Sequence, residues 1–396
     1  MTRLVSIGLG RSAPRWRALL LRTSVLFVAV LASACSNYLG DGPDPARAGR
    51  AGGGSVGGSG GGSGSGSGGG TFQGEGGASA GSPPLVEGVS VNALALDDKT
   101  VYFSTNQGLA KVAKSGGNPV PLGGFSQLNG LALGPQAIYA VNGDGSLISV
   151  RKDGTSTMTL VPATCGGGSG AIALDAGNIF FTTGSSLRTA AIGAGAPSDL
   201  ATDVWQAGGP ATGARLALDA DNIYYVGNSN TGGQGALFGV SRLSVGNPIC
   251  MGMSRQGTRL ATAKGSLAAL IGDGTRLYFT DLTSNGLAPV LAVSAVIAPL
   301  LGPAQVTELA SLTASNNSSQ SAGNALTSDG TYLYFGAFAG IYRVLVDGPS
   351  CTAAALPCAK PELVVPGAMA TALAVDEDFL YYGDQNGPSA LKKLAK

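Results

Sequence analysis

The same short phrase of sequence returns seven times between residues 94 and 382. Each copy has an apolar run centred on Leu or Ile, then a turn position, and four residues later an aliphatic residue followed by one or two aromatic residues. The turn positions are Asp97, Gly134, Asp175, Asp219, Asp273, Asp329 and Asp376. They run from 97 to 376 in six steps, an average of 46.5 residues. One four-stranded propeller blade takes roughly 40 to 50 residues, so the repeat predicts a seven-bladed β-propeller.

Within each repeat, short apolar runs alternate with turn residues. Leu94–Leu96 and Val101–Phe103 are two such runs, Leu109–Val112 has the pattern of a third strand, and Asn142–Gly145 has the composition of a hairpin turn. No stretch shows sustained helical periodicity. The sequence therefore predicts one all-β domain over residues 84–396.

The first run of each repeat has the pattern of an innermost blade strand. Three residues before the turn position every copy has Leu or Ile, and four residues before it six copies have Ala or Gly. Such alternation suits a strand that packs between blades on one face and lies near a crowded axis on the other. Because the chain ends at Lys396 after a third strand, we expect Leu85–Gly88 to supply the missing outer strand of the last blade.

Residues 1–34 have the pattern of a secretory signal. A region with five arginines precedes the apolar run Val25–Leu31 and the small residues Ala32–Ala34. This apolar run is too short for a membrane-spanning helix, which needs about 20 residues. We therefore expect the chain to be exported.

The stretch that follows resembles the bacterial lipobox. It reads Leu31-Ala32-Ser33-Ala34-Cys35, with Ala32 at a position where that family prefers leucine. The resemblance implies that Cys35 is acylated and becomes the mature N-terminus. Ser36 after the cysteine implies sorting to the outer membrane, with the protein facing either the periplasm or the cell surface.

Residues 35–83 are predicted to be a disordered tether. From Asp41 to Ser82 the sequence is dominated by Gly, Ser and Ala, so it has too little apolar surface to offset the entropy of ordering. A glycine-rich coil of this length spans roughly 35 Å. It would hold the folded domain away from a membrane surface.

Composition excludes several kinds of chemistry. The chain has no histidine, which rules out Ser-His-Asp and Cys-His catalysis and histidine metal ligands. Loss of residues 1–34 would leave 19 basic and 23 acidic residues, a balance that disfavours nucleic acid as a partner. We predict no cofactor and no metal site.

Several second strands resemble those of YWTD propellers. Tyr278-Phe279-Thr280-Asp281 differs by one residue from the Tyr-Trp-Thr-Asp phrase, and Tyr381-Tyr382-Gly383-Asp384 is a looser version. The resemblance, which extends to NHL-type propellers, supports the fold class. It implies no particular activity, because propellers include enzymes, receptors and scaffolds.

The turn aspartates and the cysteines each allow two interpretations. The aspartates could be acid/base or calcium-binding groups, but their single occurrence per repeat at one turn favours a structural role. Cys351 and Cys358 flank one insertion, so we expect them to form a disulfide, which leaves Cys165 and Cys250 as a second pair by elimination. A zinc site is the alternative use, but no Cys-x-x-Cys pair supports it.

The candidate ligand site lies where the inner strands begin. Arg215 replaces the small residue found in the other copies, and polar residues occupy the preceding position in several repeats. Together they predict a polar ring at the axial mouth that binds a small anionic or polar group. The predicted ligand-binding residues are Arg215, Asn92, Asn129, Asn324 and Thr371.

These features favour a membrane-anchored binding or scaffold module of the bacterial cell envelope. Its partners would be the membrane, through the lipid on Cys35, and an envelope protein or a small ligand. The alternative is an enzyme without histidine, of the lactonase or lyase kind, that holds a metal in the channel. A stoichiometric divalent ion in the purified protein would favour this alternative.

Overall fold

The computed structural model describes residues 83–396 except 126, 164–169, 194–195, 203, 205–214, 229–234, 245–246, 249–256, 285–288, 298–305, 314–323, 338 and 349–359. The chain divides into two compact units, residues 1–74 and 75–396, and every described residue belongs to the second. Cys35 and the four other cysteines lie outside the described residues. The predicted signal, tether, lipidation and disulfides therefore stay predictions.

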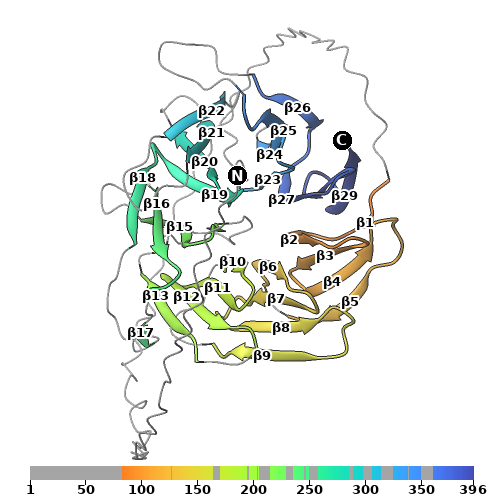
Figure 1. Cartoon of the computed structure of the whole chain (residues 1–396). Helices are drawn as coiled ribbons and strands as arrows, with labels where there is room; N and C mark the ends of the chain where they lie inside the picture. Colours follow the sequence, from red (N-terminus) through yellow and green to blue (C-terminus); the bar gives the residue numbers. More distant parts are fainter. Residues whose placement is uncertain are drawn as a thin grey trace, which may run out of the picture. The chain divides into compact units, whose positions relative to one another are not determined.

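The described residues form seven antiparallel sheets, one for each copy of the repeat (Figure 1). The first strands of sheets 1 to 7 are β2 (Val91–Leu96), β6 (Gly130–Leu133), β10 (Ile172–Leu174), β14 (Leu216–Leu218), β19 (Ser266–Gly272), β23 (Leu326–Ser328) and β27 (Ala370–Val375). The second strands are β3 (Thr100–Thr105), β7 (Ala137–Val141), β11 (Asn178–Thr183), β15 (Asn222–Asn228), β20 (Arg276–Ser284), β24 (Tyr332–Ala337) and β28 (Phe379–Asp384).

The third and fourth strands complete the sheets. The third strands are β4 (Gly108–Ala113), β8 (Leu147–Arg151), β12 (Ser186–Ala191), β16 (Gly235–Ser241), β21 (Pro289–Ile297), β25 (Gly340–Leu345) and β29 (Ala390–Ala395). The fourth strands are β5 (Val120–Gly123), β9 (Thr157–Val161), β13 (Ser198–Ala201), β18 (Thr258–Thr262), β22 (Val306–Thr313), β26 (Glu362–Pro366) and β1 (Val86–Glu87). A short strand, β17 (Asn247–Pro248), extends sheet 3 beyond β13.

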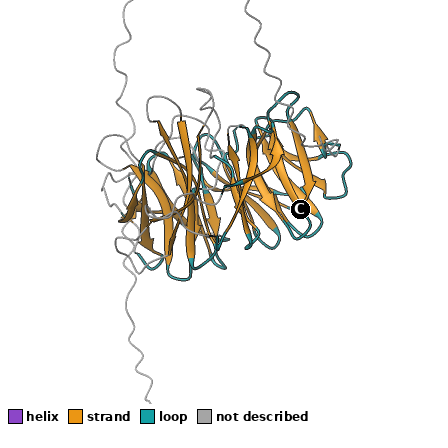
Figure 2. Ribbon diagram, turned by 90° about the horizontal axis from the view of Figure 1, so that it is seen from above, coloured by secondary structure: helices purple, strands orange, loops and turns teal. Residues whose placement is uncertain are grey.

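The sheets lie around a common centre, with their first strands innermost (Figure 1). Figure 2 shows strands and loops, and the described residues include no helix. The prediction of an all-β propeller is confirmed.

The described core residues form seven clusters, each between two neighbouring sheets. Adjacent residues of a strand point to opposite faces, so the aromatic pair of the second strand, which every sheet except sheet 2 has, serves two clusters. In sheet 1, Tyr102 packs towards sheet 2 and Phe103 towards sheet 7. In sheet 5, Tyr278 packs towards sheet 6 and Phe279 towards sheet 4. This double use explains why the repeat keeps an aromatic pair.

The first strands approach one another closely. A Cβ atom added at Gly130 of sheet 2 would stand 2.3 Å from the carbonyl oxygen of Gly170, which precedes β10 of sheet 3. No real Cβ atom comes this close to a backbone oxygen, so glycine is required there. Small residues on the inner strands are thus imposed by the neighbouring sheet.

Sheet 7 is completed by the beginning of the domain, as the sequence predicts. β1 pairs antiparallel with β29, with Val86 opposite Leu391 and Glu87 opposite Ala390. The Leu85 N–H donates to the Leu391 carbonyl at 2.8 Å. Leu85 and Val86 are buried in the cluster between sheets 7 and 1. One short strand therefore joins the two ends of the domain.

Deleting residues 84–89 should lower the melting temperature by several degrees. The deletion removes the burial of Leu85 and Val86, which contributes roughly 3 kcal/mol or more, and exposes the edge of β29. Differential scanning calorimetry of the full-length chain measures the effect. A chain lacking residues 45–75 is the control, and equal losses in the two deletions would contradict the closing role of β1.

Candidate functional site

The turn between the first and second strands is held by its aspartate. In sheet 1, Asp97 Oδ1 accepts hydrogen bonds from the Lys99 N–H at 3.1 Å and the Thr100 N–H at 2.9 Å. The same two-bond pattern recurs at Asp175, Asp219, Asp273, Asp329 and Asp376. The prediction that these aspartates are structural is confirmed.

Five of the six aspartates also accept a hydrogen bond from the hydroxyl of the tyrosine five residues later, and Asp175 has Phe180 at that position instead. The Tyr102 hydroxyl lies 2.9 Å from Asp97 Oδ2, and the Tyr278 hydroxyl lies 2.7 Å from Asp273 Oδ2. Equivalent bonds join Tyr224 to Asp219, Tyr334 to Asp329 and Tyr381 to Asp376. Burial and the bond to Asp97 raise the pKa of Tyr102 to about 12. A buried phenol is thereby satisfied without water.

Within the described residues, a cation from the next sheet pairs with the aspartate of four of these turns. Lys114, directly after β4, lies 2.7 Å from the Asp376 carboxylate of sheet 7. The other pairs are Lys152 with Asp97 at 3.7 Å, Lys396 with Asp329 at 2.9 Å, and Arg242 with Asp175. We call these four pairs the inter-sheet clasps. Each one bonds the third-strand end of one sheet to the first turn of the preceding sheet.

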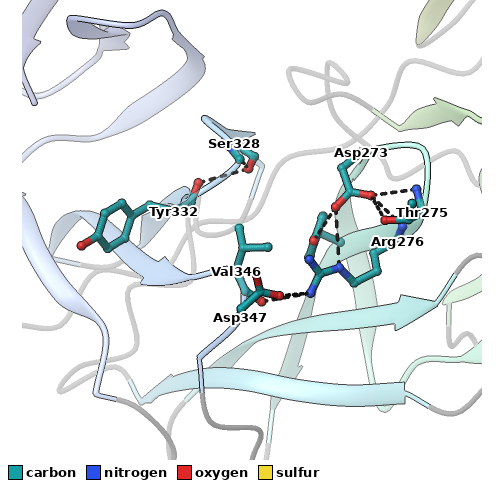
Figure 3. A network of polar contacts seen from close by, with 9 residues as sticks. Asp273, Thr275, Arg276, Ser328, Tyr332, Val346 and Asp347 are labelled. Atoms are coloured by element: carbon teal, nitrogen blue, oxygen red, sulfur yellow. Dashed lines mark hydrogen bonds and ion pairs between the residues drawn. The ribbon is translucent and has the colours of Figure 1, made fainter.

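Between sheets 5 and 6 the charges are reversed. Figure 3 shows the Arg276 guanidinium of sheet 5 between Asp273 of its own turn and Asp347 of sheet 6. Its Nη1 lies 2.6 Å from Asp347 Oδ1. Val346 stands where the clasps have their cation, and it is buried in the cluster between these sheets.

The contact between sheets 2 and 3 lacks both partners of a clasp. Gly134 replaces the turn aspartate, and Ile192 stands directly after β12, where the clasps have Lys or Arg. Ile192 packs against the apolar cluster between these two sheets. The carboxylate and the cation are therefore absent together, as expected if the role of both residues is to form the ion pair.

The turn aspartates make stability depend on pH. Burial alone would raise the pKa of Asp329, but hydrogen bonds from the turn backbone, Lys396 and Tyr334 outweigh it and lower this pKa to about 2. The pKa of Asp273 is also lowered to about 2, because hydrogen bonds led by that of Tyr278 outweigh burial. An unfolded aspartate titrates at about 3.9. The stabilisation is thus complete above about pH 4 and lost as the pH falls towards about 2.

Asp329→Asn should make the free energy of unfolding depend less steeply on pH between pH 4 and pH 2. The variant removes one carboxylate whose ionised form is favoured in the folded state. Urea unfolding at several pH values measures the slope. Asp98→Asn, which changes an exposed neighbour of a turn aspartate, is the control. An unchanged slope in Asp329→Asn would contradict the lowered pKa.

The axis of the domain holds a small cavity of about 100 Å³. Its walls come from the first strands of sheets 1, 2, 3, 6 and 7, with the predicted alternation of small residues and Leu or Ile. Asn129 and Asn324 are its two amide-bearing lining residues. Two of the five predicted ligand-binding residues therefore meet at the axis.

The other three predicted residues are not among the lining residues of this cavity. Asn92 Nδ2 donates to Asn106 Oδ1 at 3.0 Å, and the Thr371 hydroxyl donates to the Val91 carbonyl of sheet 1 at 2.6 Å. Arg215 is 8% exposed, and its Nε donates to the Ala268 carbonyl of sheet 5 at 3.1 Å. Thr371 and Arg215 thus join neighbouring sheets instead of pointing freely into an axial mouth.

One nitrogen of Arg215 has no partner among the described residues. Its Nη1 is buried and makes no hydrogen bond to any of them. Burial lowers the pKa of the guanidinium, and no carboxylate of the described chain pairs with it. A buried cationic donor in this state is costly unless an anion or a polar group completes it.

A second polar pocket, in sheet 5, was missed by sequence reasoning. Asp281, Ser294 and Glu308 line it. One sequence feature could have revealed this pocket. Sheets 5 and 7 both have an aspartate eight residues after the turn aspartate. In the described part of the chain, no group of three or more Asp, Glu, Cys or His residues is placed to hold a metal ion. No helix among these residues could span a membrane.

No protein-family model matches the sequence, and no curated protein matches it significantly. Among solved structures, the complex described as YCF48 bound to D1 peptide is 13% identical, with 79% of this chain and 94% of that chain covered and a TM-score of 0.51. BamB from Moraxella catarrhalis is 17% identical, with 77% and 85% covered and a TM-score of 0.44. At this identity the match to YCF48 shows a shared fold and says nothing about shared activity.

Proposed function

We propose that this chain is a membrane-anchored β-propeller whose seven sheets act as blades of one closed ring and serve as a binding or scaffold module at the cell envelope. The observation that carries the proposal is the use of the repeated carboxylates. All six turn aspartates accept bonds from their own turn, so the most numerous candidate acid/base groups are committed to structure. Such an arrangement supports a rigid binding surface.

The end of the ring where the inner strands begin is the better candidate for the binding surface. Asn129 and Asn324 line the axial cavity there, and Arg215 brings an unpartnered donor to the start of β14. At the opposite end four of the six turn aspartates are already paired in clasps. YCF48 has a D1 peptide bound in its solved structure, which adds a peptide to the partner chemistries to be tested.

Anchoring through Cys35 is the second part of the proposal, and it rests on the lipobox resemblance. Two or more acyl chains would hold the protein stably on a membrane, which one chain does not achieve. The glycine-rich residues 41–82 would then let the propeller reach partners at a distance from the bilayer.

A photo-crosslinking residue at Gln107 should capture a partner in intact cells. Gln107 is exposed in the turn between β3 and β4, beside Asn106, whose side chain bonds Asn92. The control places the same residue at Asp98, exposed at the opposite end of β2. We expect a discrete adduct at Gln107 and none at Asp98. Equal labelling at both positions, or none at either, would count against a binding surface at this end.

The anchor is tested in the same cells with Cys35→Ser. This variant should leave the membrane fraction and lose the Gln107 adduct if the partner is held at the membrane. Retention in the membrane fraction with an unmodified N-terminus would disprove lipidation. Release from the membrane fraction and loss of the Gln107 adduct are scored separately. A released variant that still captures its partner would support lipidation and leave the binding surface intact.

A further inference from the structure

A cavity of about 220 Å³ opens beside sheet 5, away from the axis. Phe279 and Asp281 of β20, Ser294 of β21 and Glu308 of β22 line it, together with Lys264 from the connection between β18 and β19. Phe279 is paired with Ser294, and Ser294 with Glu308. Because paired residues share a face of a sheet, an aromatic ring, a hydroxyl and a carboxylate form one row across this face.

Asp281 is a buried carboxylate beside this cavity. It is 5% exposed and accepts hydrogen bonds from the Lys264 N–H at 2.7 Å and the Gly265 N–H at 2.9 Å. Burial raises its pKa despite these bonds. The Lys264 side chain is 80% exposed, and its Nζ lies 3.4 Å from Glu308. No ion pair of Asp281 occurs within the described ranges.

Sheet 7 has a carboxylate at the equivalent position, and there it forms an ion pair with a lysine. Asp384 follows its turn aspartate by eight residues, as Asp281 does in sheet 5, and it is equally buried, at 5% exposed. There, Lys392 Nζ lies 2.9 Å from Asp384 Oδ2. This sheet shows which group satisfies a carboxylate at this position of the repeat.

Ser294 occupies in sheet 5 the place that Lys392 has in sheet 7. Lys392 is paired with Tyr382, and Ser294 with Phe279, in each case the second residue of the aromatic pair. Because sheet 5 has a serine where sheet 7 has a lysine, sheet 5 lacks the ammonium group and its four-carbon stem. The cavity beside Asp281 lies where that stem and that charge are missing.

We propose that this cavity binds an alkylammonium group of about the size of a lysine side chain. The ammonium donates to the Asp281 carboxylate and to Glu308, and the carbon stem packs on the Phe279 ring, a surface that also favours a cation. A cation here offsets the cost of burying Asp281 without a countercharge. The group belongs either to a free primary amine or to a lysine of a protein partner, and the ammonium chemistry is the same.

The test uses n-butylammonium with the purified full-length chain, and 1-butanol as the uncharged mimic. Isothermal titration should detect binding of n-butylammonium and not of 1-butanol. Asp281→Asn should weaken binding by about tenfold or more, because a charged hydrogen bond is lost. Asp384→Asn is the matched control. It removes the same carboxylate from sheet 7, where Lys392 fills the site, and should leave n-butylammonium affinity unchanged.

Ser294→Lys provides a second variant that does not depend on the stability of Asp281→Asn. It rebuilds the pair of sheet 7, so it should raise the melting temperature and abolish n-butylammonium binding. Lysine blocked at both its amino and carboxyl ends distinguishes the sources. Binding of this compound points to a partner's lysine, and binding of n-butylammonium alone points to a free amine. Binding of neither, or equal binding to wild type and Ser294→Lys, would overturn the proposal.

Discussion

Each sheet of this domain has apolar side chains on both faces, so no sheet can bury its own core. The aromatic pair of the second strand makes this constraint unavoidable, because its two neighbouring rings point to opposite sides. Tyr102 and Phe103 show the result, with one ring in the cluster towards sheet 2 and the other in the cluster towards sheet 7. A linear stack would leave two apolar faces exposed, whereas a ring leaves none. The pairing of β1 with β29 joins the two ends.

The hydrogen bonds and ion pairs of the turn aspartates follow the same packing of neighbouring sheets. The tyrosine that packs towards the next sheet also donates its hydroxyl to the turn aspartate, so burial of the ring and satisfaction of the phenol occur together. The clasp cation then comes from the sheet against which that ring packs, as Lys152 does for Asp97. Surface ion pairs contribute little singly. Here each one reinforces an apolar contact that already exists, and none competes with it.

Much of the fold could be predicted from the sequence, because one repeat unit encodes both strand pattern and interface. The all-β class, the inner strands, the structural aspartates and the closing strand at Leu85–Gly88 all followed from the spacing of residues. The site was predicted less well. Asn129 and Asn324 meet at the axial cavity, but Arg215 bonds the Ala268 carbonyl instead, since a long side chain in a small-residue position can extend between sheets. The clasps and the sheet 5 cavity depend on strand register and on which sheets are neighbours, and a single repeat does not contain this information.

A double-mutant cycle on Lys114 and Asp376 tests most directly whether the clasps couple neighbouring sheets. The pair joins sheets 1 and 7, its atoms lie 2.7 Å apart, and its side chains are only 17% and 23% exposed. Free energies of unfolding of Lys114→Met, Asp376→Asn and the double variant should give a coupling of about 0.5 to 1 kcal/mol. The same cycle on Lys114 with Asp329, which pairs with Lys396, should give a value near zero. Equal coupling in the two cycles would contradict the account.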